Sequence, residues 1–351
     1  MKVHKVKGVL FLLLALVLMA TALGPAPALA TPAGPSGTLY VATAGNQSVV
    51  AIDLASGSVE NEISVAANIP HGLAITPGGQ RLYVSYMGGT TIKVIDTATG
   101  QVVDTITVGV PSHHIQVNRQ GTELYIAPGA GNLFYIYDLR EGSLLPPLVV
   151  GTGATDVAVS PDGRTALVAS TGFVPTSVPA SVSVVDLLNK EVLAIVSLPA
   201  AIGLTPAADH VIFSPNGKLG YVVDRGANRL AVLDLSTLTW VGSVIVGTAP
   251  HGIVVTNDGK YIYMGNRGLS PSFGNTLSVI DAETYTVVET ITITVGTRPD
   301  HLTLDRSGRF IFIPITRPVG SQKMLILEVA TNTIVDEIAV GKDLHVSVQG
   351  R

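Results

Sequence analysis

Short apolar runs rich in β-branched residues recur along almost the whole chain, and turn residues separate them. Typical examples are residues 49–52 (VVAI), 230–233 (LAVL) and 277–280 (LSVI). Runs that alternate with polar positions, or stay apolar over a few residues, are typical of half-buried and fully buried β-strands. They lack the period of about 3.6 residues that an amphipathic helix shows. The pattern therefore predicts an all-β chain.

An acidic residue closes the apolar run at regular intervals. Successive acids are 42 to 48 residues apart, which divides the chain into seven units. An internal repeat of this length largely determines the fold. Turn residues follow each acid, so we interpret these acids as turn-forming and not as catalytic carboxylates. They are Asp53, Asp96, Asp138, Asp186, Asp234, Asp281 and Glu328.

Each unit divides into four strands. In the second unit they are residues 73–75, 82–84, 92–95 and 102–108. The turn after the first strand carries a glycine in most units, and glycine can take the positive φ that a tight hairpin needs. Four strands in a repeat of this length predict one blade of a β-propeller.

The two ends of the chain complement each other. The chain enters the repeat at strand two (residues 39–41) and ends with residues that correspond to strand one (344–350). Together they complete one blade and leave no open sheet edge between the first and last units. The predicted fold is an all-β, seven-bladed β-propeller with four antiparallel strands per blade, formed by residues 38–351 as a single domain.

The repeat resembles the YVTN-type β-propeller repeat of YncE-like and surface-layer-type extracytoplasmic propellers. The resemblance covers residues 38–351, although the literal tetrapeptide is replaced by forms such as residues 40–43 (YVAT). It implies the propeller fold and leaves the function open, because propellers host many unrelated functions. In the second unit the matching residues are 70–72 (PHG), 74–78 (AITPG), 83–84 (YV), 94–96 (VID), 99–100 (TG) and 106–109 (ITVG).

The N-terminus has the pattern of a secretory signal peptide. Three lysines precede an uninterrupted apolar run, residues 9–20, and residues 28–30 (ALA) supply the small side chains of a cleavage site. The run is shorter than the roughly 20 residues needed to span a bilayer. We predict a signal peptide at residues 1–30 and a short flexible lead at 31–37. The mature protein is then extracytoplasmic (secreted, periplasmic or cell-surface), with no integral membrane segment after cleavage.

Composition limits the chemistry that this chain can perform. The 351 residues are 47% hydrophobic and 13% charged, a balance that argues against disorder. The sequence has no cysteine, so any site must use histidine, carboxylates, hydroxyls or backbone groups. Three of the 21 basic residues fall in the signal peptide, which leaves an excess of seven acids over bases. Bulk attraction to nucleic acid is therefore not expected.

The histidines of the mature chain share one position in the repeat. All seven fall at two adjacent positions that open strand one, and every unit supplies a His or an Asp there. Strand one is the innermost strand of a blade, so these residues are expected to ring one mouth of the central channel. The candidate metal ligands are His71, His113, His114, His210, His251, His301, His345, Asp156, Asp209 and Asp300.

Three interpretations of this ring stay open. Imidazole and carboxylate groups in one concave place suit a divalent metal ion. The same groups suit another polar ligand, or a general base near neutral pH. The third interpretation is structural, with each histidine capping the turn into strand one by bonding the backbone of a neighbouring blade. Because adjacent strand residues point to opposite faces, we expect that not all seven histidines converge.

The loops between strands two and three emerge at the same mouth and differ in length, which is typical of the recognition side of a repeat protein. Arg225, Arg267 and Arg317 lie just past strand two in three successive units. They suit a carboxylate or phosphate ligand, or they pair with nearby aspartates such as Asp209, Asp224 and Asp300. The aromatic candidates for stacking on a ligand are Tyr86, Phe173 and Phe273.

The sequence favours a monomeric extracytoplasmic binding or scaffold protein that presents this mouth to a protein, a glycan or a small anionic ligand. Its support is the lack of a nucleophile elbow, an HExxH motif or a phosphate loop in the sequence. The alternative is a metal-dependent enzyme or redox-associated protein that uses the His/Asp ring. By resemblance, related propellers bind copper clusters, haem d-type cofactors or magnesium at this mouth. A weaker alternative is single-stranded nucleic acid binding, which the acidic charge disfavours.

Overall fold

The computed structural model describes residues 34–65, 69–172, 178–269, 272–293, 297–316, 322–341 and 343–350. Residues Pro35–Arg351 form one compact unit. Within the described ranges the regular elements are all β-strands. None of these residues belongs to a helix long and apolar enough to cross a membrane.

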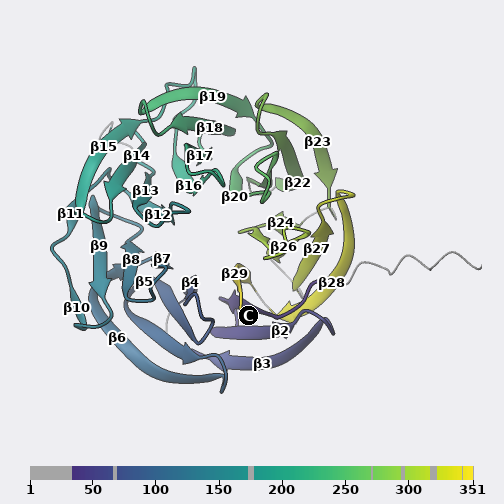
Figure 1. The fold of residues 1–351 in the computed structure, drawn as a ribbon. Coiled ribbons are helices and arrows are strands. Elements are labelled where there is room, and N and C mark those ends of the chain that lie inside the picture. The colour runs from purple at the N-terminus through teal and green to yellow at the C-terminus, as the bar shows by residue number, and fades with distance from the viewer. Residues whose placement is uncertain are drawn as a thin grey trace, which may run out of the picture. The chain divides into compact units, whose positions relative to one another are not determined.

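The strands of the Pro35–Arg351 unit form seven antiparallel sheets around a common centre (Figure 1). The first sheet contains β29 (Leu344–Gln349), β1 (Thr38–Thr43), β2 (Ser48–Asp53) and β3 (Ser58–Ser64). The second contains β4 (Pro70–Ile75), β5 (Arg81–Asp96) and β6 (Gln101–Ser112). The third contains β7 (His114–Val117), β8 (Glu123–Ala127), β9 (Leu133–Asp138), β10 (Ser143–Leu144) and β11 (Leu148–Val149).

The remaining four sheets follow in chain order. The fourth contains β12 (Ala154–Val159), β13 (Thr165–Ser170), β14 (Ser181–Asp186) and β15 (Glu191–Ser197). The fifth contains β16 (Ala208–Phe213), β17 (Leu219–Asp224), β18 (Arg229–Asp234) and β19 (Thr239–Ile245). The sixth contains β20 (Pro250–Val255), β21 (Tyr261–Leu269), β22 (Ser272–Asp281) and β23 (Thr286–Thr292). The seventh contains β24 (Arg298–Pro299), β25 (Thr303–Leu304), β26 (Phe310–Thr316), β27 (Gln322–Glu328) and β28 (Thr333–Gly341).

This arrangement confirms the predicted seven-bladed all-β propeller. In the second blade, β5 contains the residues of both predicted middle strands. The first blade is closed by the two ends of the chain, because β29 pairs antiparallel with β1, with Leu39 opposite Gln349 and Tyr40 opposite Val348. Strands β4, β7, β12, β16, β20, β24 and β29 lie nearest the centre in Figure 1.

The hydrophobic core lies between neighbouring blades. Leu167 and Val182 of the fourth blade pack in one cluster with Val222 and Leu233 of the fifth, and each of the other blade junctions holds a similar cluster. The outermost strand of a blade faces solvent on one side, so β15 alternates exposed and half-buried residues. The apolar residues of each unit therefore lie on both faces of its sheet, where they pack against the two neighbouring blades.

The repeated acids have the structural role that the sequence predicts. Asp186 Oδ1 accepts hydrogen bonds from the backbone N–H groups of Leu188 and Asn189, at 2.8 and 3.0 Å. The bond from Asn189 is the main reason that the pKa of the Asp186 carboxyl is lowered. Gly163, in the other turn of this blade, has a φ of 76°. These carboxylates hold turns at the rim and lie outside the candidate site.

Candidate metal centre

The innermost strands are irregular where the candidate histidines lie. In the fifth blade Ala208 pairs with Asp224 but His210 pairs with Val223, so Asp209 is an extra residue on β16. The innermost strands of four further blades show comparable register shifts near their first residues. A bulge of this kind bends the strand and redirects its side chains. Because of these bulges, side chains of adjacent residues at these positions need not point to opposite faces of the sheet.

All seven histidines of the propeller converge, so the expectation that some would point away is wrong. Neighbouring rings form a continuous set with centroid separations of 3.9 Å for His71 and His113, 4.4 Å for His210 and His251, and 5.0 Å for His301 and His345. His113 lies between the end of β6 and the start of β7, where strand alternation does not apply. We call these seven residues, with Asp156, Asp209 and Asp300, the histidine cluster.

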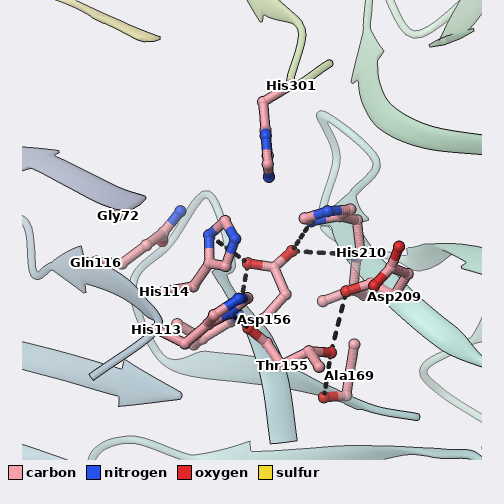
Figure 2. A network of polar contacts seen from close by, with 12 residues as sticks. Gly72, His113, His114, Gln116, Thr155, Asp156, Ala169, Asp209, His210 and His301 are labelled. Atoms are coloured by element: carbon pink, nitrogen blue, oxygen red, sulfur yellow. Dashed lines mark hydrogen bonds and ion pairs between the residues drawn. The ribbon is translucent and has the colours of Figure 1, made fainter. Parts of the chain in front are cut away.

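Asp156 orients two imidazoles of the histidine cluster. Its Oδ2 lies 3.1 Å from His210 Nδ1, and its Oδ1 lies 3.5 Å from His114 Nδ1. The backbone N–H of Val211 donates to the same Oδ2 at 3.1 Å. Figure 2 shows the carboxylate between the two rings, with the ring of His301 pointing toward them from the other side.

Asp300 has the same relation to three further imidazoles. It is fully buried, and its Oδ1 lies 2.7 Å from His301 Nδ1, 3.4 Å from His345 Nδ1 and 3.5 Å from His251 Nδ1. Across both carboxylates, five histidines turn Nδ1 toward an aspartate. The hydrogen bond from His210 Nδ1 to Asp156 fixes that ring and leaves Nε2 as the ligating atom, as in carboxylate–histidine–metal arrangements. Asp300 Oδ1 makes no hydrogen bond to the described residues, so Asp300 can itself be a ligand.

Burial keeps most of these imidazoles neutral. It is the main cause that lowers the pKa of His71, His114 and His251 well below the usual range, and nearby imidazoles add to it. Burial likewise lowers the pKa of His301 to about 3. His210 differs: burial opposes its charged form, but its hydrogen bond to Asp156 raises its pKa. Neutral imidazole is the form that binds metal ions.

Several ring nitrogens are buried without a hydrogen bond to any described residue. They include His71 Nδ1, His114 Nε2 and both ring nitrogens of His301, in residues that are all less than 10% exposed. Buried polar atoms are normally paired, and an exception calls for an explanation such as an ion. Four groups in the cluster offer three ligand atoms within 4.8 Å of one another: His71/His113/His114, His114/His210/His301, Asp209/His210/His251 and His251/Asp300/His301.

One histidine also joins blades as the structural interpretation expects. His113 Nδ1 lies 2.9 Å from the backbone O of Thr155 in the next blade. This contact leaves His113 Nε2 on the other side of the ring. Capping and ligation are therefore compatible at this residue.

The arginines pair with the carboxylates of the histidine cluster. Arg225 Nε lies 3.0 Å from Asp209 Oδ2, and Arg267 Nη2 lies 3.2 Å from Asp300 Oδ2. Asp224, which the sequence offered as another partner, instead pairs at 2.8 Å with Arg229, a buried residue that the repeat pattern did not single out. Arg317 lies outside the described residues.

The aromatic candidates do not form a common surface among the described residues. Tyr86 is 1% exposed and its hydroxyl donates to the backbone O of Val65 at 3.0 Å, so its ring lies in the core and offers no face for stacking. Phe173 and the side chain of Phe273 lie outside the described part of the chain.

A cavity of about 240 Å³ adjoins the histidine cluster. His114, His210, His301 and Asp156 line one part of it, and apolar residues of the innermost strands such as Ile115 line the rest. Gln116 and Ser347 also line it, although no sequence motif marks them. The cluster is therefore open to a small space in the channel.

Comparisons with known proteins agree with this fold. A family model described as "Lactonase, 7-bladed beta-propeller" matches residues 207–316. The chain is 30% identical over 92 residues to "Uncharacterized protein YncE" of Salmonella typhimurium, and 29% identical over 92 residues to the YncE protein of Salmonella typhi. Each match covers 26% of this chain and 24% of the relative, so the chain spans about a quarter of the length of the curated relatives it matches.

Solved structures resemble nearly the whole propeller. Kuenenia stuttgartiensis hydrazine synthase superposes with a TM-score of 0.69 at 18% identity, covering 86% of this chain and 92% of that one. Dihydro-heme d1 dehydrogenase NirN, solved in complex with DHE, superposes with a TM-score of 0.68 at 14% identity, covering 91% of this chain and 76% of that one. At these identities the likeness concerns the fold.

Proposed function

We propose that this chain is a YncE-like seven-bladed β-propeller that acts as a binding protein, and that its ligand is a transition-metal ion held by the histidine cluster. One observation carries the proposal. Seven imidazoles and three carboxylates meet in the channel, and buried nitrogens of His71, His114 and His301 have no hydrogen bond to the described residues. A purely structural cluster would pair these atoms, because each unsatisfied buried group costs about 1–3 kcal/mol.

The donor set selects a class of metal. Imidazole nitrogen suits copper, zinc, iron and nickel, whereas magnesium and calcium prefer oxygen ligands. The chain has no cysteine, so thiolate coordination is excluded. Copper and zinc are therefore the ions to test first.

The site would work outside the cytoplasm. Support comes from the signal-peptide pattern of residues 1–30, with 31–37 as a lead to the propeller of 38–351, and from the relation to YncE. We propose that the mature chain is a monomer. Its channel mouth remains the proposed docking face for a protein, a glycan or a small anion, where Arg225 and Arg267 are already paired with aspartates of the histidine cluster.

Metal analysis tests the proposal. Mature chain from residue 31, purified without a tag or chelator, is titrated with copper, zinc and magnesium, and bound metal is measured after desalting. We expect at least one copper or zinc ion per chain and no retained magnesium. His301→Gln should weaken binding at least tenfold, whereas Asp104→Asn, at an exposed carboxylate, should not change it. Wild-type protein that retains no copper or zinc at micromolar concentration would contradict the proposal.

A further inference from the structure

We propose that the histidine cluster holds two copper ions, one at His71, His113 and His114 and the other at His251, Asp300 and His301. This inference rests on the proposed function and adds the number and type of ions to it. The first set is called the imidazole triad and the second the carboxylate triad. Each triad offers three ligand atoms within 4.8 Å of one another.

The two triads share no residue and come from different blades. The imidazole triad uses β4 and the start of β7, whereas the carboxylate triad uses β20 and the segment between β24 and β25. A metal ion bound by nitrogen ligands takes about four of them. One ion therefore leaves most of the ten cluster side chains unused, and two ions use both triads at once.

Unpaired atoms occur in both triads. In the imidazole triad they are His71 Nδ1 and His114 Nε2, and in the carboxylate triad they include His301 Nε2. An ion in one triad would leave the unpaired atoms of the other triad without a partner. His210 lies between the triads, with ring centroids 5.2 Å from His114 and 4.4 Å from His251. It can complete the coordination of either ion.

Charge favours copper over a pair of strictly divalent ions. The cluster has three carboxylates, but Arg225 and Arg267 already pair with two of them. Arg298 is also near enough to interact with the charge of Asp300. Little negative charge remains to offset two divalent ions in a buried place, where uncompensated charge is costly. Copper can bind imidazole as Cu(I), which halves the charge, and the imidazole triad itself carries no carboxylate.

Copper stoichiometry decides the question. Mature protein is loaded anaerobically with excess Cu(I) under ascorbate and desalted, and bound copper is measured with a colorimetric Cu(I) chelator in denaturant. We expect two copper ions per chain. A value of one would overturn this inference and leave the proposed function standing, with the central group His114/His210/His301 as the single site. A value of zero for both copper and zinc would overturn the proposed function as well.

Variants separate the two triads. His113→Gln and His251→Gln should each reduce the stoichiometry from two to one, and the double variant should bind none. Asp104→Asn, which replaces an exposed carboxylate outside the cluster, should still bind two copper ions. If either single variant loses both ions while near-UV circular dichroism shows native packing, the triads are not independent and the inference is wrong. If a single variant does not fold, His71→Gln or His301→Gln replaces it in the same triad.

Discussion

At the scale of single residues, Asp300 is a fully buried carboxylate that contacts several basic side chains at once. It is fully buried and faces the Nδ1 atoms of three histidines, while Arg267 pairs with its other oxygen. Burial alone would raise the pKa of Asp300, but the nearby imidazoles, His345 first, hold it well below the usual range. The Asp300 carboxylate is therefore ionised. It contacts three candidate metal ligands and also pairs with Arg267, so its replacement should affect both metal binding and the stability of the fold.

Replacing this carboxylate should destabilise the metal-free protein. Asp300→Asn keeps the shape of the side chain but leaves the Arg267 guanidinium without its countercharge. Breaking a buried pair in this way typically costs about 3–5 kcal/mol. Urea unfolding should show a loss of this size in the free energy of unfolding, and no loss beyond about 0.5 kcal/mol for the exposed control Asp104→Asn. Equal stability of the two variants would show that Asp300 does not hold the cluster together.

Acid should also destabilise the metal-free protein. His71, His114, His251 and His301 have lowered pKa values in the folded state, whereas in the unfolded chain they titrate near 6.5. Below that pH the unfolded state binds more protons, so stability falls as pH decreases from about 6.5 toward the folded pKa values. His210, with its raised pKa, contributes with the opposite sign.

Urea midpoints at pH 7.5, 6.0 and 5.0 measure this effect in a range where carboxylates stay ionised. Each lowered histidine contributes up to about 1.4 kcal/mol per pH unit below its unfolded pKa. His71→Gln should therefore show a shallower decline than the wild-type protein. A midpoint that stays constant from pH 7.5 to 5.0 would mean that the imidazoles accept protons freely in the folded state.

At the scale of elements, two of the bulged innermost strands, β4 and β20, need glycine after the histidine. A Cβ at Gly252 would lie 2.1 Å from the backbone O of Asp300, and one at Gly72 would lie 2.7 Å from that of His113. The Pro-His-Gly pattern of β4 and β20 therefore lets the next blade approach the histidine. The glycine is a packing requirement between two blades, and it brings ligands from both blades together.

Adding a methyl group at this position should disturb both the fold and the site. Gly252→Ala forces β20 away from Asp300 and His301, so we expect a loss of about 1–3 kcal/mol in stability together with weaker copper binding. Thermal unfolding and copper titration measure the two effects. Gly34→Ala is the matched control, because a Cβ there meets nothing within 4 Å. If Gly252→Ala is destabilised but binds copper as the wild-type protein does, Gly252 is needed for packing between the blades and not for placing the copper ligands.

At the scale of the whole propeller, closure depends on the pairing of β29 with β1. This pairing covers the edge of β1 and brings His345 into the histidine cluster, where its ring lies 4.1 Å from that of His71. The last strand therefore contributes both to the sheet and to the site. An open edge at this place would be available to another chain.

Removing residues 344–351 should open the ring. We expect a lower and broader thermal transition, and association of chains through the exposed edge of β1 in light scattering after size-exclusion chromatography. His345→Gln in the full chain is the control, since it removes the imidazole and keeps the strand pairing. A truncated chain that stays monomeric and equally stable would show that β29 is not needed for closure.

The sequence by itself determined the number of blades, the four-stranded pattern, the turns at Asp53 to Glu328 and the closure by residues 344–350. The strands and turns depend on residues close together within one unit, so local patterning specifies them. The closure joins distant residues, but the repeat frame reveals it because the two ends of the chain supply complementary strands of one blade. Only the tertiary structure decided that His113 and His114 converge with five other histidines, that Asp156 and Asp300 orient their rings, and that Asp224 pairs with Arg229. The cluster contacts join residues from different blades and follow from bulges and ring closure. A repeat pattern places such residues at equivalent positions, but it does not specify which way each side chain turns.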